Sequence, residues 1–259
     1  MPDHPKSRTP DTSPGEPASA AFRRILAEEC KRLRDAADAA DDADAAPPTP
    51  FSDEDAVLES VSRIHALLRA GGEILGSPAR EASRHAARIE GGLRPNAPAS
   101  PWKPHAKSTR TAGSGSPAEA LRSPDGRRLL ERLDRIVSAD GQSPRDSSEP
   151  GGPRAARQIF GRAWRKLMRR TRKYRSSIPD EVLAVEREGV RRLRLLAEVL
   201  GELLPPSAPR FIARARELEA GLAALEANPS DEAPRGRERE AWAQWRQFRR
   251  RSTERLARG

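Results

Sequence analysis

Three arginines recur about one helical turn apart within residues 179–203. Arg187, Arg191 and Arg194 are separated by four and three residues, so a helix carries them on one side. Glu198 follows at the same step. Guanidinium groups spaced about 5–6 Å apart suit a run of phosphates, because each can donate a pair of hydrogen bonds to phosphate oxygens. The row predicts the wall of a positively charged groove. Glu198 is expected to orient an arginine there, because a carboxylate facing phosphate would repel it.

The opposite side of the same segment is apolar. It carries, at steps of three and four residues, Val182, Val185, Gly189, Leu193, Leu196, Leu200 and Leu203. Such a stripe is typical of a helix that packs on a core. The arginine row is itself flanked by Leu183, Val190 and Leu195 rather than by polar residues. This favours a walled groove over a solvated helix face.

The segment 154–176 is the most basic part of the chain. Ten cationic side chains occur there without an acidic one: Arg154, Arg157, Arg162, Arg165, Lys166, Arg169, Arg170, Arg172, Lys173 and Arg175. Like charges one turn apart destabilise a helix unless an anion neutralises them. We therefore expect a polyanion track that includes Lys166, Arg170 and Lys173. A solvated helix face is the alternative, and nothing in the pattern specifies a nucleobase.

The sequence offers little for catalysis or metal binding. Its four histidines are scattered, and with the single Cys30 they give no metal-ligand spacing, so no metal site is expected. Gly71-Gly72 and Gly91-Gly92 lack the preceding strand of a phosphate-binding loop. Carboxylates are abundant but unpaired, and no nucleophile–histidine arrangement has supporting context. We expect neither enzymatic activity nor a cofactor.

Composition limits the partners and the compartment. The 259 residues carry a net charge of +10, with 33% charged and 36% apolar residues. Such a basic chain favours anionic partners: nucleic acid, polyphosphate or an acidic membrane surface. No stretch reaches the ~20 apolar residues of a membrane span, and residues 1–19 lack the apolar run of a signal peptide. With one cysteine, no intrachain disulfide can form. A cytoplasmic protein without membrane insertion is expected.

Helical periodicity recurs along the chain, and strict two-residue alternation is absent, so the predicted class is all-α. Proline, glycine and serine separate the helices. The expected non-helical segments are a disordered tail at 1–19, a basic linker at 95–115 and a loop at 140–152. Helices are expected near 20–40, from 52, from 77, from 124, and over 154–176, 179–203, from 209 and 236–258.

The order of residues in 179–206 resembles a known family. In the conserved histidine α-helical domain (CHAD) family, a helix carries His, Arg, Lys, Arg and Glu at the spacings found here for Ala184, Arg187, Arg191, Arg194 and Glu198, followed by Leu-Leu-Pro-Pro at 203–206. The segment 120–133 resembles a helix start midway through the same family. The likeness covers 116–226 and is faint over 20–94. The chain resembles a diverged member in which Ala184 replaces the signature histidine.

The resemblance implies two pseudo-symmetric antiparallel helical bundles with a basic groove between them, over residues 20–258. The N-terminal half would be 20–94 and the C-terminal half 116–258. A short internal repeat fits this division, because residues 68–75 align with 193–200 and Arg69 then matches Arg194. On that basis Arg69 and His65 would face the arginine row across the groove. A boundary histidine without a ligand is the simpler interpretation of His65.

The sequence thus predicts a non-catalytic protein that binds inorganic polyphosphate. The expected contacts are Arg187, Arg191, Arg194, Arg69, His65, Lys166, Arg170 and Lys173. By resemblance, the protein is expected at polyphosphate granules in a bacterial cytoplasm. Two alternatives stay open: a nucleic-acid-binding helical protein that uses 154–176 and 236–258, and a helical interaction scaffold whose charges serve only solubility.

Overall fold

The computed structural model describes residues 15–43, 53–93, 117–139, 150–174, 178–227 and 232–258. Within these ranges the chain is helical and contains no strand beyond an isolated bridge between Pro17 and Gly151, so the all-α prediction is confirmed. The first helix begins at Ala18. The predicted linker at 95–115 lies outside the described residues, as do residues 1–14 of the predicted tail and 140–149 of the predicted loop.

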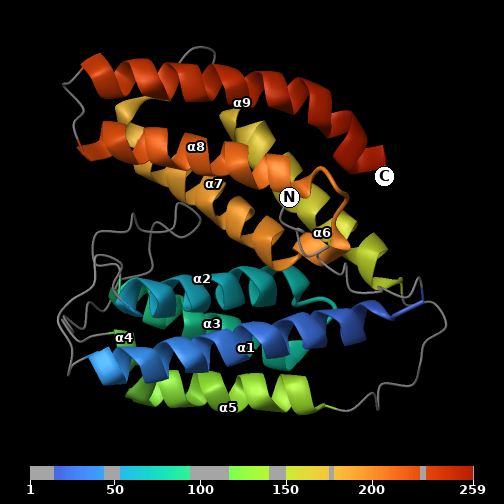
Figure 1. Cartoon of the computed structure of the whole chain (residues 1–259). Helices are drawn as coiled ribbons and strands as arrows, with labels where there is room; N and C mark the ends of the chain where they lie inside the picture. The colour runs from blue at the N-terminus through green and yellow to red at the C-terminus, as the bar shows by residue number, and fades with distance from the viewer. Residues whose placement is uncertain are drawn as a thin grey trace, which may run out of the picture.

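Five helices form one layer-like group, drawn from blue to green in Figure 1. They are α1 (Ala18–Ala43), α2 (Asp53–Gly71), α3 (Ser77–Leu93), α4 (Pro117–Arg122) and α5 (Pro124–Ser138). α5 shows why the sequence folds this way locally. The Ser123 side chain accepts a hydrogen bond from the Gly126 N–H at 3.1 Å, and Pro124 occupies the first turn, where no N–H is needed.

Four further helices of the described residues form the second group. These are α6 (Gly152–Thr171), α7 (Asp180–Val199), α8 (Ala208–Ala227) and α9 (Glu232–Arg258). Their core contains an aromatic cluster in which Phe211 contacts Phe160, Trp164 and Trp245, with ring centroids 5.1–5.6 Å apart. Trp242 and Trp245 are both 1% exposed. This burial removes them as stacking platforms for nucleic-acid bases.

The division between the two groups differs from the predicted one. The sequence analysis assigned 116–258 to the second half, but α4 and α5 pack against α1 and α3. Leu129, Leu133 and Ile136 of α5 are buried, and Arg132 forms an ion pair with Glu81 of α3 at 2.8 Å. The motif order placed α5 after the linker, but it did not show which apolar face this helix meets.

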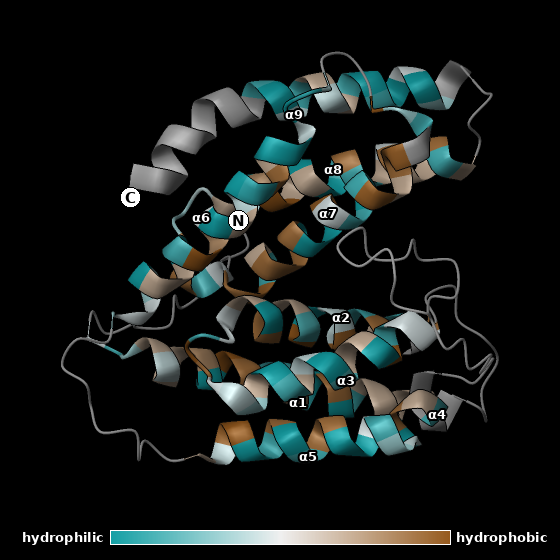
Figure 2. Cartoon of the chain, turned by 180° about the vertical axis from the view of Figure 1, so that it is seen from behind, coloured by the Kyte–Doolittle hydropathy of each residue, from teal (hydrophilic) through white to brown (hydrophobic). Residues whose placement is uncertain are grey.

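The two groups meet along α2, α6 and α7. α2 contacts both α7 and α6, and α1 contacts α6, as the stacked arrangement in Figure 1 shows. Hydrophilic and hydrophobic residues alternate along these helices in Figure 2, as expected for helices that each bury one face. The predicted pseudo-symmetry between the groups stays a prediction.

Candidate functional site

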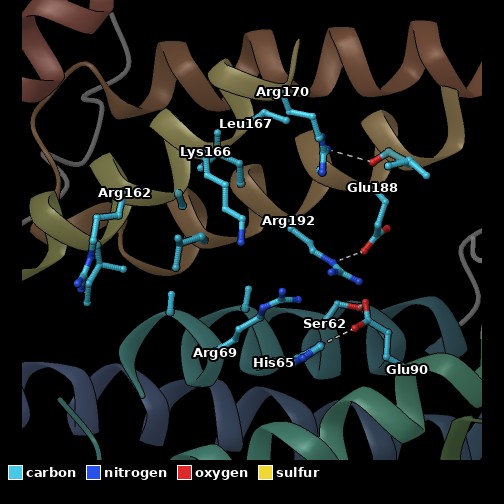
Figure 3. Close-up of a pocket in the computed structure, with 18 of the residues that line it drawn as sticks. Ser62, His65, Arg69, Glu90, Arg162, Lys166, Leu167, Arg170, Glu188 and Arg192 are labelled. Atoms are coloured by element: carbon cyan, nitrogen blue, oxygen red, sulfur yellow. Dashed lines mark hydrogen bonds and ion pairs between the residues drawn. The ribbon is translucent and has the colours of Figure 1, made fainter. Parts of the chain in front are cut away.

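A cavity of about 390 Å³ lies where α2, α6 and α7 meet. Its charged lining is mixed but predominantly positive. Five cationic side chains contribute to it, namely Arg69, Arg162, Lys166, Arg170 and Arg192, beside three carboxylates, Glu73, Glu90 and Glu188. Figure 3 shows Lys166 and Arg192 reaching from α6 and α7 toward Arg69 on α2. Cations from three helices, distant in sequence, therefore converge on one space.

Two guanidinium groups confront each other across this cavity. Partial desolvation lowers the pKa of Arg69, and the nearby positive charge of Arg192 lowers it further. Arg192 donates from Nε to Glu188 Oε1 at 2.5 Å. Among the described residues, Arg69 has no hydrogen-bonded carboxylate. An anion placed between Arg69 and Arg192 would relieve their repulsion.

Arg170 has a structural contact as well as a place in the cavity wall. Its Nε donates to Glu186 Oε2 at 2.7 Å, and its Nη2 donates to the Val185 carbonyl at 3.3 Å. Glu186 is 1% exposed, so Arg170 neutralises a buried charge. Gly189 makes this contact possible, because a Cβ there would lie 2.2 Å from Arg170 Nη2. Arg170 thus fixes α6 against α7.

His65 belongs to a buried network at the α2 side of the cavity. Its Nδ1 lies 2.7 Å from Glu90 Oε2, and Ser62 Oγ donates to Glu90 Oε1 at 2.9 Å. Arg191 donates from Nη1 to the same oxygen at 3.1 Å and from Nη2 to Ser62 Oγ at 3.0 Å. Burial alone would raise the pKa of Glu90. The hydrogen bond and charge of His65 and the charge of Arg191 outweigh it and hold that pKa well below its ordinary value.

The arginine row on α7 is not among the residues that line the cavity. Arg187 forms an ion pair with Glu226 at 2.9 Å. Arg191 is bound to Glu90, and Arg194 donates to Glu219 of α8 at 2.7 Å. Each arginine of the row is therefore matched by a carboxylate from α3 or α8. The sequence predicted apolar walls around the row. Helical periodicity could not predict the carboxylate partners, because they lie on other helices, far away in the chain.

Glu198 lies at the centre of a second ion-pair cluster. It accepts from Arg194 Nη1 at 2.9 Å and from Arg216 Nη2 at 2.8 Å. Burial lowers the pKa of Arg194, but Glu219 and Glu198 outweigh that effect and raise it. Lys173, another predicted contact, does not line the cavity, and its Nζ lies 5.0 Å from the Tyr174 ring. The structure thus brings together Arg69, His65, Lys166 and Arg170 from the predicted set and leaves the remaining members outside the cavity.

Arg162 and Arg192 were missed by the sequence analysis as cavity residues. A signal was available for Arg192, which precedes Leu193 and lies beside the apolar stripe. That stripe was expected to face only the core, yet Val185, Gly189, Leu193 and Leu196 all line the cavity. Arg162 forms an exposed ion pair with Glu73 at 2.8 Å. No periodicity could have indicated that pair, because it joins α6 to the turn that follows α2.

The family relationship follows from a model match. The CHAD domain model matches residues 57–226, which run from α2 into α8 and cover the cavity. The chain belongs to the CHAD domain family. No curated protein and no solved structure matches the chain. The replacement of the CHAD signature histidine by Ala184 stays a prediction from the motif alignment.

The described part of this CHAD domain contains no group of three or more His, Cys, Asp or Glu that could hold a metal ion. Across the same residues, no helix combines the length and apolarity needed to span a membrane. The cavity lining carries five cationic side chains against three carboxylates.

Proposed function

We propose that this CHAD domain binds inorganic polyphosphate, without catalysis, at the cavity between α2, α6 and α7. The observation that carries the proposal is the convergence of five cationic side chains from three helices on one cavity. Arginine and lysine donate charge-assisted hydrogen bonds to phosphate oxygens, and a fixed arrangement of such donors loses little entropy on binding. Association with polyphosphate granules in the cytoplasm is part of the same proposal.

The cationic residues have different roles in this proposal. Arg69, Lys166 and Arg192 contact the phosphates. Arg170 positions α6 through its ion pair with Glu186. Arg191 and Arg194 act through their carboxylate partners, and Glu198 orients Arg194. Arg187, which keeps about a third of its side chain exposed, is an outer contact for a longer phosphate chain.

Binding to nucleic acid is the second candidate, and one observation favours it. The outer face of α6 exposes Arg165, Arg169 and Arg172, which recur about one turn apart. Such a row could follow a nucleic-acid backbone without reading bases. A titration with long-chain polyphosphate and with duplex DNA at matched phosphate concentration separates the candidates. Displacement of DNA by polyphosphate at low concentration supports the cavity, whereas a preference for DNA supports the α6 face. The third candidate, an interaction scaffold, predicts that neither polyanion binds with measurable affinity.

Polyphosphate affinity is expected to fall steeply with salt. Binding to several cations releases counterions, with a slope of about 0.7 per neutralised phosphate for a single-chain polyanion. Contacts with three phosphates then predict that affinity falls roughly a hundredfold when salt rises tenfold. Fluorescence titrations at a series of salt concentrations measure the slope. An affinity independent of salt would contradict a polyanion site.

Glu188→Gln is expected to increase polyphosphate affinity. The Glu188 carboxylate occupies the Nε donor of Arg192 at 2.5 Å and adds negative charge to the cavity wall. Removing one partly exposed ion pair of this kind changes binding by roughly two- to fivefold. Isothermal titration calorimetry gives the ratio, with Glu131→Gln on α5 as a control of equal charge change. An equal gain in both variants would show a long-range charge effect without a role for Glu188 at the cavity.

A further inference from the structure

The cavity has an apolar interior beneath its charged groups. Ile159 and Leu167 of α6 and Leu193 and Leu196 of α7 line it and are each 3–5% exposed. Ala66, Ala70 and Ala163 add small apolar side chains to the same lining. The cavity lining therefore contains aliphatic side chains from each of the three helices.

The charges and the apolar surface occupy different depths. Arg69, Arg162 and Lys166 are exposed at the surface of the molecule, whereas the leucines and Ile159 are buried. In Figure 3 the labelled cationic side chains extend into the opening between α2 and the two helices above it. The arrangement is thus a cationic rim over an aliphatic floor, with the buried hydrogen-bonded network of Ser62, His65 and Glu90 at the α2 side.

Inorganic phosphate chains use only the rim. They have no apolar surface, and placing a hydrated anion against buried leucines costs free energy unless every oxygen finds a donor. A ligand that joins a phosphate to an aliphatic group uses both parts, because the phosphate meets the cations while the aliphatic group covers the floor. About 390 Å³ falls in the usual size range of small-molecule sites.

We propose that this cavity binds an organic phosphate in which a saturated aliphatic group is joined directly to the phosphate. The inference rests on the proposed function in one respect, since both place a phosphate at Arg69, Lys166 and Arg192. Among the described residues that line the cavity, none is Phe, Tyr or Trp, and the one aromatic ring, that of His65, is engaged with Glu90 at 2.7 Å. A nucleobase is bound through stacking on aromatic side chains, so the lining favours an aliphatic group over a nucleotide.

A chain-length series tests the proposal on the full-length protein. Calorimetric titrations use methyl, butyl and octyl phosphate below their micelle concentrations, together with inorganic tripolyphosphate. Each methylene that the floor removes from water raises affinity by about fourfold, so octyl phosphate is expected to bind at least about thirtyfold more tightly than methyl phosphate. Equal affinities across the series would overturn the proposal.

The series also separates this inference from the proposed function. Tripolyphosphate binding without any chain-length effect would overturn the inference and leave polyphosphate binding intact. Tight binding of octyl phosphate that tripolyphosphate cannot displace would support the inference and contradict polyphosphate binding at this cavity. Absence of binding by all four compounds would overturn both.

The variant Ala163→Leu tests whether the dependence of affinity on alkyl chain length comes from the aliphatic floor of the cavity. The larger side chain narrows the cavity from α6, and leucine is a good helix former. The ratio of octyl to methyl phosphate affinity is expected to fall from about thirtyfold or more to near one.

Ala224→Leu, at a half-buried alanine on α8 outside the cavity lining, is the matched control and keeps the wild-type ratio. An unchanged ratio in Ala163→Leu would overturn the assignment to this cavity. Circular dichroism verifies that each variant folds, and the wild-type series tests the proposal without any variant.

Discussion

Replacing Arg69, Lys166 and Arg192 together with glutamine is expected to weaken polyphosphate binding by two to three orders of magnitude. Hydrogen bonds to charged groups contribute about 1.5–3 kcal/mol each. The three contributions are not independent, so the expected loss is below their simple total. Arg69 and Arg192 are also the pair whose mutual repulsion a bound phosphate relieves, and this relief disappears with both charges. Fluorescence or calorimetric titration with long-chain polyphosphate measures the change.

A matched control removes the same net charge elsewhere. Arg127, Arg128 and Arg135 are exposed on α5, which Figure 1 shows on the far side of the first group from α6 and α7. Changing these three to glutamine is expected to alter affinity by no more than a few fold, because only the long-range field changes. If the two triple variants lose affinity equally, binding reflects general basic charge and the cavity is not the site.

The all-α class and the approximate starts of most described helices could be predicted because they depend on local features. The Ser123 cap and the spacing of Leu129, Leu133 and Ile136 lie within one segment, and α5 forms where they predict it. The family was likewise recognisable from the local order of residues on α7, and the model match over 57–226 agrees with it. Periodicity identified the apolar and polar faces of α7. It could not identify which helices or which cavity each face contacts.

The composition of the site depends on pairing between distant segments. Glu90 is 101 positions from Arg191, yet it accepts that arginine's hydrogen bond. Glu219 does the same for Arg194 from α8. Without these partners the arginine row looked available for phosphate. The apolar stripe was misjudged for a related reason, since the gap between α2, α6 and α7 leaves part of it facing a cavity. Such pairings arise from tertiary packing, to which a helical pattern is insensitive.

Arg191→Met is expected to destabilise the protein by about 3 kcal/mol, the lower end of the usual cost of breaking a buried ion pair, because His65 and Ser62 still contact Glu90. Arg191 is 8% exposed and Glu90 10%, so solvent screens their interaction little. Methionine preserves most of the aliphatic volume, which confines the change to the lost charge and hydrogen bonds. Thermal unfolding followed by circular dichroism is expected to show a Tm lower by on the order of 10 °C.

Two further variants separate the network from the cavity. Arg192→Met removes a neighbouring arginine that is a third exposed and paired with Glu188, so its Tm is expected to change little. Adding Glu90→Gln to Arg191→Met removes the buried carboxylate that has lost its arginine partner and is expected to recover part of the lost stability. A double variant no more stable than Arg191→Met would show that the isolated Glu90 charge is not the cause of the loss.

The pH dependence gives an independent measure of the same network. The pKa of Glu90 is lower in the folded protein than in the unfolded chain, where a glutamate titrates near about 4.3. Its contribution to stability is therefore fully present above about pH 4.3 and is lost as the pH falls toward its folded value. Urea unfolding at a series of pH values is expected to show this loss in the wild type and a smaller one in Glu90→Gln. Equal slopes in the two proteins would mean that Glu90 is not held ionised by His65 and Arg191. Unequal slopes would assign Arg191 a structural role, together with His65, in holding Glu90 ionised.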